Sequence, residues 1–206
     1  MKILVASTNP GKLAELSAML EADVEWAGLG DFEGIAEVAE DGASFAANAR
    51  KKALEYAKAT GCWTIADDSG LMVDALGGEP GVNSARFSGE RGEGVSRKEH
   101  DKKNIEKVLE LLGGTPPEKR GARFVCCLCL ASPEKVLIET EGTLEGYITE
   151  SEMGENGFGY DPIFYLPRLG KTAAQLTSEE KNSISHRGRA IRKLKPFLKK
   201  LLENSR

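Results

Sequence analysis

Residues 2–20 read KILVASTNPGKLAELSAML, and this stretch indicates the class of fold. Residues 2–7 are mostly apolar and typical of a buried strand, which the Pro-Gly pair at 10–11 ends. From Lys12 onward, leucines recur at the spacing of a helix. A strand, a glycine-containing loop and a helix in this order predict an α/β fold.

The alternation of strand and helix patterns continues along the chain. A helix is predicted over residues 44–61, and the apolar strand 63–66 leads into an acidic loop at 67–70. Residues 77–94 are rich in glycine and charge, so we expect an exposed loop there. A second long helix is predicted over residues 96–112, which open with the capping-box pattern S-x-x-E.

A hairpin follows in the second half of the chain. Residues 122–132 and 136–143 predict two antiparallel strands, and residues 147–148 and 163–166 predict two further short strands. Residues 185–202 predict a terminal helix whose apolar positions share one face. Strand–helix units combined with a hairpin indicate a mixed sheet.

The composition is that of a soluble globular protein. The chain has 206 residues, of which 40% are hydrophobic and 29% charged, so residues 1–206 can bury a core as one domain. A smaller lobe is predicted at about 86–121, between two glycine-rich stretches. The longest apolar run, near 124–131, is far shorter than the roughly 20 residues that cross a membrane. Without a membrane span or a signal-peptide pattern, we expect a cytoplasmic protein.

Charge is unevenly distributed along the chain. The net charge of −4 argues against a general nucleic-acid binder. Residues 171–206 nevertheless carry ten Lys/Arg against three Glu. This basic segment indicates a local anion site or, alternatively, the solvated face of the terminal helix.

Three of the four cysteines, Cys126, Cys127 and Cys129, lie in one predicted strand. Only Cys127 and Cys129 share a face of that strand, and no second Cys/His pair follows at zinc spacing. We therefore interpret the cluster as small hydrophobic side chains packed in the core, and not as a metal site.

The first candidate site is the turn between the first strand and helix. A helix N-terminus offers N–H groups and positive dipole, the hydroxyls add donors, and a lysine adds a full charge, which together suit a polyphosphate. An ordinary turn with a helix cap is the alternative. The residues concerned are Ser7, Thr8, Asn9, Pro10, Gly11 and Lys12.

The second candidate site contains adjacent carboxylates. Asp67 and Asp68 follow a buried strand, where two neighbouring acids repel each other, so their presence favours a cation ligand or a general base. Mg²⁺ takes one or two carboxylates and leaves its other positions to water and phosphate. Glu40 can supply a second carboxylate, although an acid before a helix is also favoured by the helix dipole. An Asx turn is the alternative interpretation of the aspartate pair.

The third and fourth candidate sites lie near the C-terminus. In residues 154–162, glycines allow the backbone to approach a flat ligand closely. Phe158 or Tyr160 can stack on a base, and Asp161 can accept hydrogen bonds from it. A tight turn is the alternative interpretation of the same pattern. In residues 180–188, His186 and Arg187 oppose the dipole of the terminal helix, which indicates a bound anion unless they form only a surface helix start.

Taken together, these segments resemble the inosine triphosphate pyrophosphatase family, which hydrolyses noncanonical purine nucleoside triphosphates. The resemblance implies an elongated α/β fold with a central twisted mixed β-sheet, two lobes flanking a substrate cleft, a homodimer and dependence on Mg²⁺. The matching motifs are STNPGK (7–12), IADDSGL (65–71), LGGEPG (76–81), SARF (84–87), GFGYDP (157–162) and SHRG (185–188).

The resemblance also implies roles for individual residues. Asp68 corresponds to the catalytic acid and Mg²⁺ ligand, with Ser69 beside it in contact with the substrate, and residues 7–12 correspond to the phosphate-binding loop. The family usually has an acid before the Asn-Ala of its second helix, whereas Ala47 precedes Asn48 here. The remaining substrate contacts correspond to Phe158, Gly159, Tyr160, Asp161, Lys181, His186 and Arg187.

We therefore expect an enzyme that hydrolyses ITP, dITP or XTP to the nucleoside monophosphate and pyrophosphate, with Mg²⁺ on Asp68 and Glu40. Two alternatives stay open: a pyrophosphatase of modified pyrimidine nucleotides, and a module that binds a nucleotide without turnover. The aspartate pair argues against the module, because a protein that only binds an anion gains nothing from added negative charge without a metal. Neither charge nor spacing excludes the pyrimidine enzyme.

Overall fold

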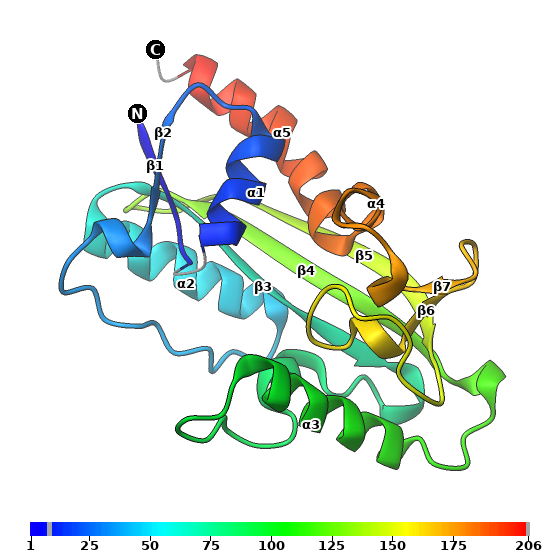
Figure 1. The fold of residues 1–206 in the computed structure, drawn as a ribbon. Helices are drawn as coiled ribbons and strands as arrows, with labels where there is room; N and C mark the ends of the chain where they lie inside the picture. The colour runs from blue at the N-terminus through cyan, green and yellow to red at the C-terminus, as the bar shows by residue number, and fades with distance from the viewer. Residues whose placement is uncertain (8–9, 205–206) are drawn as a thin grey trace. The chain divides into compact units, whose positions relative to one another are not determined.

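The computed structural model describes residues 1–7 and 10–204, with the side chains of Pro10, Gly11, Lys12 and Glu15 outside the description. It is a mixed α/β fold built on an open seven-stranded sheet in the order β2-β1-β3-β4-β5-β6-β7 (Figure 1). The strands are β1 (Lys2–Val5), β2 (Glu25–Gly28), β3 (Trp63–Val73), β4 (Gly121–Ala131), β5 (Val136–Ile148), β6 (Phe164–Leu166) and β7 (Lys171–Thr172). The helices are α1 (Pro10–Leu20), α2 (Phe45–Thr60), α3 (Arg97–Leu111), α4 (Ser178–Ile184) and α5 (His186–Asn204).

The sheet is mixed, as the sequence predicts. β1 pairs in parallel with β2 and with β3, and its Val5 lies opposite both Gly28 and Ile65. β6 pairs antiparallel with β5 and with β7. The parallel part follows from the strand–helix units at the start of the chain, because a crossover connection returns the chain in the same direction.

The chain forms two compact units, which we describe separately. Unit 1 comprises Met1–Asp68, Cys126–Gly142 and His186–Arg206, and unit 2 comprises Ser69–Val125 and Thr143–Ser185. The predicted lobe at 86–121 falls within unit 2.

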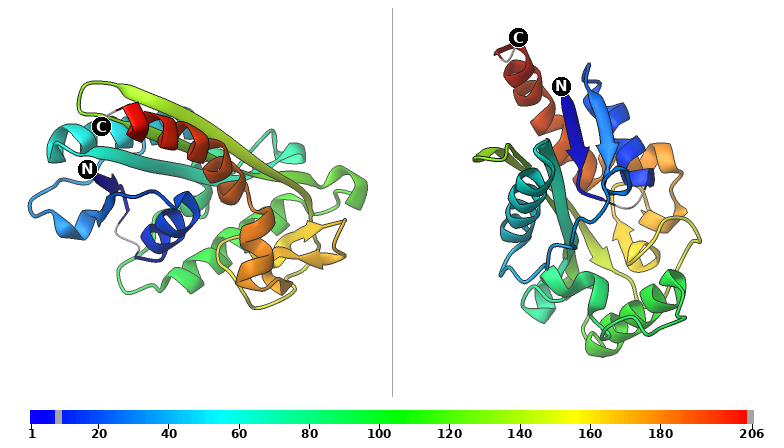
Figure 2. Two further views of the ribbon diagram at one scale, coloured as in Figure 1. Left: turned by 90° about the horizontal axis from the view of Figure 1, so that it is seen from above. Right: turned by 90° about the vertical axis from the view of Figure 1, so that its left-hand side faces the viewer.

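In unit 1, helices cover both faces of the sheet (Figure 2). Ile3 and Val5 of β1 face a core that includes Leu16 of α1 and Leu194 of α5. Leu4 points to the other face and packs with Tyr56 of α2. A strand buried on both faces needs apolar residues at consecutive positions, which explains the uninterrupted run in β1.

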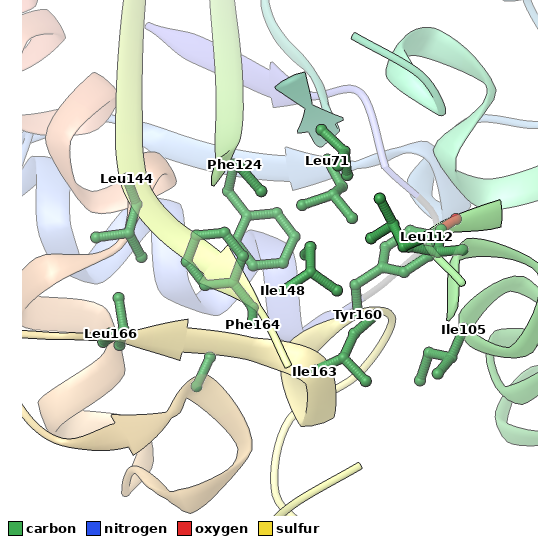
Figure 3. Packing of buried hydrophobic residues seen from close by; sticks show 14 of the residues in the cluster. Leu71, Ile105, Leu112, Phe124, Leu144, Ile148, Tyr160, Ile163, Phe164 and Leu166 are labelled. Atoms are coloured by element: carbon green, nitrogen blue, oxygen red, sulfur yellow. The ribbon is translucent and has the colours of Figure 1, made fainter. Parts of the chain in front are cut away.

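In unit 2, the core lies beside α3 and the ends of the strands (Figure 3). The rings of Phe124 and Phe164 contact each other with centroids 4.3 Å apart and planes tilted by 38°. Ile105 of α3 and Leu112, which follows the helix directly, belong to the same cluster. The predicted capping box of this helix is confirmed, because Ser96 accepts a hydrogen bond from the Glu99 N–H and Glu99 accepts one from the Ser96 N–H.

Several predicted boundaries were wrong. The acidic segment 67–70 is not a loop, because β3 continues through it to Val73. Residues 147–148 are the end of β5 and not a separate strand. The predicted exposed loop contains a 3₁₀ helix, Gly81–Arg86, with Ser84 buried. Ser185 does not start the terminal helix but ends α4, so α5 begins at His186.

Among the described residues, no helix is both long enough and apolar enough to cross a membrane. The three cysteines of β4 are buried, as predicted. Cys126 packs in the unit 1 core, and the Cys127 thiol donates to Glu141 at 3.6 Å. Burial, reinforced by Glu141 and by other nearby carboxylates, raises the pKa of Cys127 to about 12.

Candidate active site

Asp67 and Asp68 lie side by side in the middle of β3, and both side chains are buried. Since successive residues of a strand point to opposite faces, the two carboxylates point away from each other. Asp67 points toward α5 and Asp68 toward α2, as their partners show below. The strand thereby reduces the mutual repulsion on which the sequence argument for a cation ligand or a general base rested.

Arg187 provides the partner of Asp67. Its Nη2 lies 3.2 Å from Oδ2 of Asp67, and both side chains are more than 90% buried. From the sequence, Arg187 was expected to oppose the helix dipole and to bind an anion supplied by a ligand. Within the described structure, Arg187 already pairs with an anion of the protein, Asp67. His186, partly buried, is the first residue of α5.

Asn48 of α2 provides the partner of Asp68. It is fully buried, and its Nδ2 donates to Oδ2 of Asp68 at 2.9 Å. Its Oδ1 accepts from the backbone N–H of Gly42 at 2.7 Å. Asn48 therefore connects the catalytic candidate to the loop that precedes α2.

Glu40, on that same loop, forms an ion pair with Lys52 of α2. Lys52 is buried, and burial acts to lower its pKa, but the hydrogen bond and charge of Glu40, helped by Asp67 and Asp68, more than offset this and raise it. Lys52 is thus held as a cation near three carboxylates. The sequence analysis missed both Asn48 and Lys52, although their signal was present: two polar residues at helical spacing within the buried stripe of α2.

The predicted phosphate loop is described in part. Ser7 follows β1 and is partly buried, and its backbone N–H donates to the Val5 carbonyl. Thr8 and Asn9 lie outside the described residues. Pro10, Gly11 and Lys12 open α1, with proline at the first helical position, where its missing N–H costs no hydrogen bond.

In unit 2, Asp161 organises the predicted base-binding turn. Its Oδ2 accepts from the Phe158 N–H at 2.8 Å and pairs with the Lys181 ammonium. At Gly157, where φ is +80°, an added Cβ would lie 2.1 Å from that same oxygen. Gly157 is therefore required both for the backbone conformation and for the close approach of Asp161.

Phe158 is half exposed at the tip of this turn. The Lys181 ammonium lies 4.5 Å and the Arg97 guanidinium 5.1 Å from the centre of its ring. The next residue, Gly159, donates its N–H to Asp101 at 2.9 Å. Arg97 and Asp101, both on α3, are contacts of this turn that the sequence analysis missed, because their loop partner lies about 60 residues further along the chain.

Tyr160 differs from Phe158 in position. Its ring is buried in the unit 2 core, and its hydroxyl donates to the Ser84 carbonyl at 2.8 Å. Of the two aromatic rings in the turn, Phe158 is therefore the one available for stacking. Ser69, the neighbour of Asp68 on β3, is partly buried and belongs to unit 2.

Comparison with known proteins agrees with these motifs. The profile of the Ham1 family matches residues 3–197. The chain belongs to the Ham1 family. It is 47% identical to the dITP/XTP pyrophosphatase of Desulforamulus reducens over 98% of this chain and 97% of that protein. It is 50% identical to the protein of the same description in Bacillus cereus, over 94% of this chain and 92% of that one.

Solved structures of similar proteins have the same fold as this Ham1 chain. The Ham1 protein of Staphylococcus aureus superposes with a TM-score of 0.87 at 43% identity, covering 97% of this chain and 98% of the other. A nucleoside-triphosphatase, described also as a dITP/XTP pyrophosphatase, from Mycobacterium abscessus superposes with a TM-score of 0.79 at 50% identity, covering 95% and 100%.

The carboxylates of this Ham1 protein suit a metal that needs few protein ligands. Among the residues that the structure describes, no three His, Cys, Asp or Glu side chains converge as a metal cluster. Asp68 and Glu40 supply hard oxygen donors, and Mg²⁺ is usually bound by one or two protein carboxylates. Lys52 pairs with Glu40, so a metal ion bound by Glu40 would share this carboxylate with the Lys52 ammonium.

Proposed function

We propose that this protein hydrolyses noncanonical purine nucleoside triphosphates, namely dITP, XTP and ITP, to the nucleoside monophosphate and pyrophosphate. The observation that carries the proposal is the identity of 47–50%, over nearly the whole chain, to proteins described as dITP/XTP pyrophosphatases. Asp68 is a buried carboxylate that accepts a hydrogen bond from the neutral amide of Asn48, and buried ionisable groups of this kind are concentrated at functional sites, which supports a catalytic role.

Asp68 is proposed to orient and deprotonate the attacking water. Asn48 donates to Oδ2 of Asp68 and so restrains the rotation of the carboxylate, which favours a fixed direction for proton transfer. Mg²⁺, held by Asp68 and Glu40, would neutralise negative charge that develops on the phosphates. Ser7, Thr8, Asn9, Pro10, Gly11 and Lys12 are proposed to bind the triphosphate, with N–H groups and positive charge at the start of α1.

The remaining substrate contacts are proposed from their chemistry. The exposed ring of Phe158 suits stacking on a purine, and Asp161 holds the turn of Phe158, Gly159 and Tyr160 in shape. Lys181, His186 and Arg187 are proposed to add N–H donors, and Ser69 a hydroxyl. Donors that face the 6-keto group of hypoxanthine or xanthine would meet the amino group of adenine, leaving groups unpaired at about 1–3 kcal/mol each.

The experiment that tests the function measures pyrophosphate release from a panel of nucleoside triphosphates, with Mg²⁺ present or chelated. We expect dITP, XTP and ITP to be hydrolysed in preference to ATP and to modified pyrimidine nucleotides, and only with Mg²⁺. Asp68→Asn should lower kcat by about 100-fold or more, because the amide keeps the shape but cannot take the proton. Asp74→Asn, which changes an exposed ion pair with Arg123 in unit 2, is the matched control.

Each other outcome identifies an alternative. Preferred hydrolysis of a modified pyrimidine triphosphate would replace the substrate class, and nucleotide binding without pyrophosphate release would indicate a non-catalytic module. Wild-type turnover in Asp68→Asn would remove Asp68 from the mechanism. The predicted single-domain organisation, two lobes around a cleft, homodimer and cytoplasmic location stay predictions; sedimentation would test the dimer directly.

A further inference from the structure

Asn48 is a fully buried amide that bonds on both of its sides. Its Oδ1 accepts from the Gly42 N–H at 2.7 Å, and its Nδ2 donates to Oδ2 of Asp68 at 2.9 Å. A backbone N–H can only donate, so the amide oxygen must face Gly42 and the amide nitrogen must face Asp68. The loop before α2 therefore fixes which way the amide points at the catalytic candidate.

The loop at Gly42 lies very close to this amide and to the start of α2. A Cβ added at Gly42 would lie 2.6 Å from Oδ1 of Asn48 and 3.0 Å from the Cβ of Ala47. Only a residue without a side chain lets the loop approach α2 this closely. The loop backbone at Gly42 and the Asn48 amide are thus in direct contact.

A residue of the same stretch of α2 also pairs with the second acidic candidate, Glu40, on the preceding loop. Lys52, one helical turn after Asn48, pairs with Glu40, two residues before Gly42. Asn48 and Lys52 therefore connect the two proposed metal ligands, Asp68 on β3 and Glu40 on the loop, to one face of one helix. The distance between those carboxylates depends on α2 as well as on the strand.

We propose that Asn48 is a positioning residue, which fixes the position of the Asp68 carboxylate relative to the loop that carries Glu40. The proposal rests on the proposed function, in which these two carboxylates hold Mg²⁺. It requires that loss of the amide weakens metal binding and turnover beyond what a loss of fold stability explains.

Asn104 of α3 provides a matched control. It too is buried in a helix, its Oδ1 accepts from a loop N–H, that of Ser88, at 2.7 Å, and its Nδ2 donates to the Ala85 carbonyl at 3.3 Å. It lies in unit 2, with none of the proposed ligands among its partners in these hydrogen bonds. Asn48→Ala and Asn104→Ala therefore each remove a buried amide with one loop N–H donor and one acceptor, but only Asn48→Ala removes a bond to a carboxylate.

Three quantities are measured for wild type, Asn48→Ala and Asn104→Ala: the free energy of unfolding, the binding of Mn²⁺ alone by water-proton relaxation, and kcat with its half-saturating Mg²⁺ concentration for dITP. We expect both variants to lose stability, Asn48→Ala the more, because it removes a hydrogen bond to a buried carboxylate. Asn48→Ala should weaken Mn²⁺ binding and raise the half-saturating Mg²⁺ concentration by about tenfold or more, with a comparable loss of kcat, whereas Asn104→Ala stays within about twofold of wild type.

Asn48→Ala that loses stability but keeps wild-type metal binding and kcat would overturn the proposal and leave Asn48 a structural residue. If Asn48→Ala does not fold, Gly42→Ala perturbs the same amide without removing it and should show the same metal defect, against Gly30→Ala, where a Cβ meets nothing within 4 Å. A wild-type protein that binds Mn²⁺ but hydrolyses no nucleotide would instead contradict the proposed function, and the Mn²⁺ comparison would still test Asn48.

Discussion

At Asp67, a buried carboxylate meets a guanidinium 120 positions further along the chain, 3.2 Å away. At Asp68, the next residue, the partner is an amide 20 positions earlier. Both partners lie too far away in sequence for local pattern to find, so the sequence could indicate that the two acids mattered but not that they divide between two faces. The predicted loop at 67–70 was wrong because β3 continues through both aspartates, whose side chains then point to opposite faces.

Arg187→Ala tests the consequence for stability. Because the variant removes the guanidinium from a buried ion pair, we expect the free energy of unfolding to fall by about 3–5 kcal/mol, measured by urea denaturation. The simple dipole argument from the sequence would instead give a change within about 0.5 kcal/mol.

Two further variants make this result interpretable. Adding Asp67→Asn to Arg187→Ala should recover part of the lost stability. Once the guanidinium is gone, burying a neutral amide costs less free energy than burying a carboxylate. Arg50→Ala, which breaks the half-exposed pair with Glu139, should cost about 1 kcal/mol or less. Equal losses in Arg187→Ala and Arg50→Ala would mean that the buried pair adds no particular stability.

Among the elements, those with strong local signals were predicted and those fixed by distant contacts were not. Ser44 caps α2 and Gly61 ends it with φ at +70°, as the sequence indicates. The break between α4 and α5 was missed, although Thr177 and Glu180 form a capping box that the sequence contains. Because the chain restarts at His186, the placement of α5 depends on what its first turn packs against.

Gly142 of β5 determines how closely that first turn packs. A Cβ there would lie 2.1 Å from the His186 carbonyl oxygen and 2.6 Å from the Ala190 nitrogen, both backbone atoms. Gly142→Ala should therefore shift the start of α5, lowering the free energy of unfolding by about 1–3 kcal/mol and kcat/KM by about tenfold, because His186 and Arg187 move with the helix. Denaturation and steady-state kinetics check both effects. Gly30→Ala should change neither, and a normal kcat/KM in Gly142→Ala would show that catalysis does not depend on this contact.

For the whole molecule, the chain builds each unit from separated segments, and the division falls within β3, between Asp68 and Ser69. Unit 2 combines Ser69–Val125 with Thr143–Ser185, so no single stretch of sequence corresponds to it. Composition and periodicity predicted the mixed sheet, since those are properties of each stretch. Membership of a unit depends on long-range packing and is not encoded locally.

Both units also contain buried groups that resist deprotonation. Burial raises the pKa of Tyr160 in unit 2 above its ordinary value. In unit 1, burial, with nearby carboxylates, raises the pKa of Cys127 and of Cys129 from 9.0 to about 12. All three groups bind their proton more tightly in the folded than in the unfolded state, so each favours folding at neutral pH and loses that contribution as the pH rises.

Stability should therefore fall steeply between pH 9 and pH 12. Within this window an unfolded thiol is ionised and a folded one is not, so each of Cys127 and Cys129 lowers the free energy of unfolding by about 1.4 kcal/mol per pH unit. Urea denaturation at pH 7, 9, 10 and 11 measures the slope. In Cys127→Ala/Cys129→Ala, the free energy of unfolding at pH 7 should be lower because packing is lost. Its slope above pH 9 should be shallower because the two thiols no longer titrate, while Tyr160 contributes equally in both proteins. Parallel slopes in the two proteins would mean that the thiols already ionise in the native state, and that their burial does not protect them.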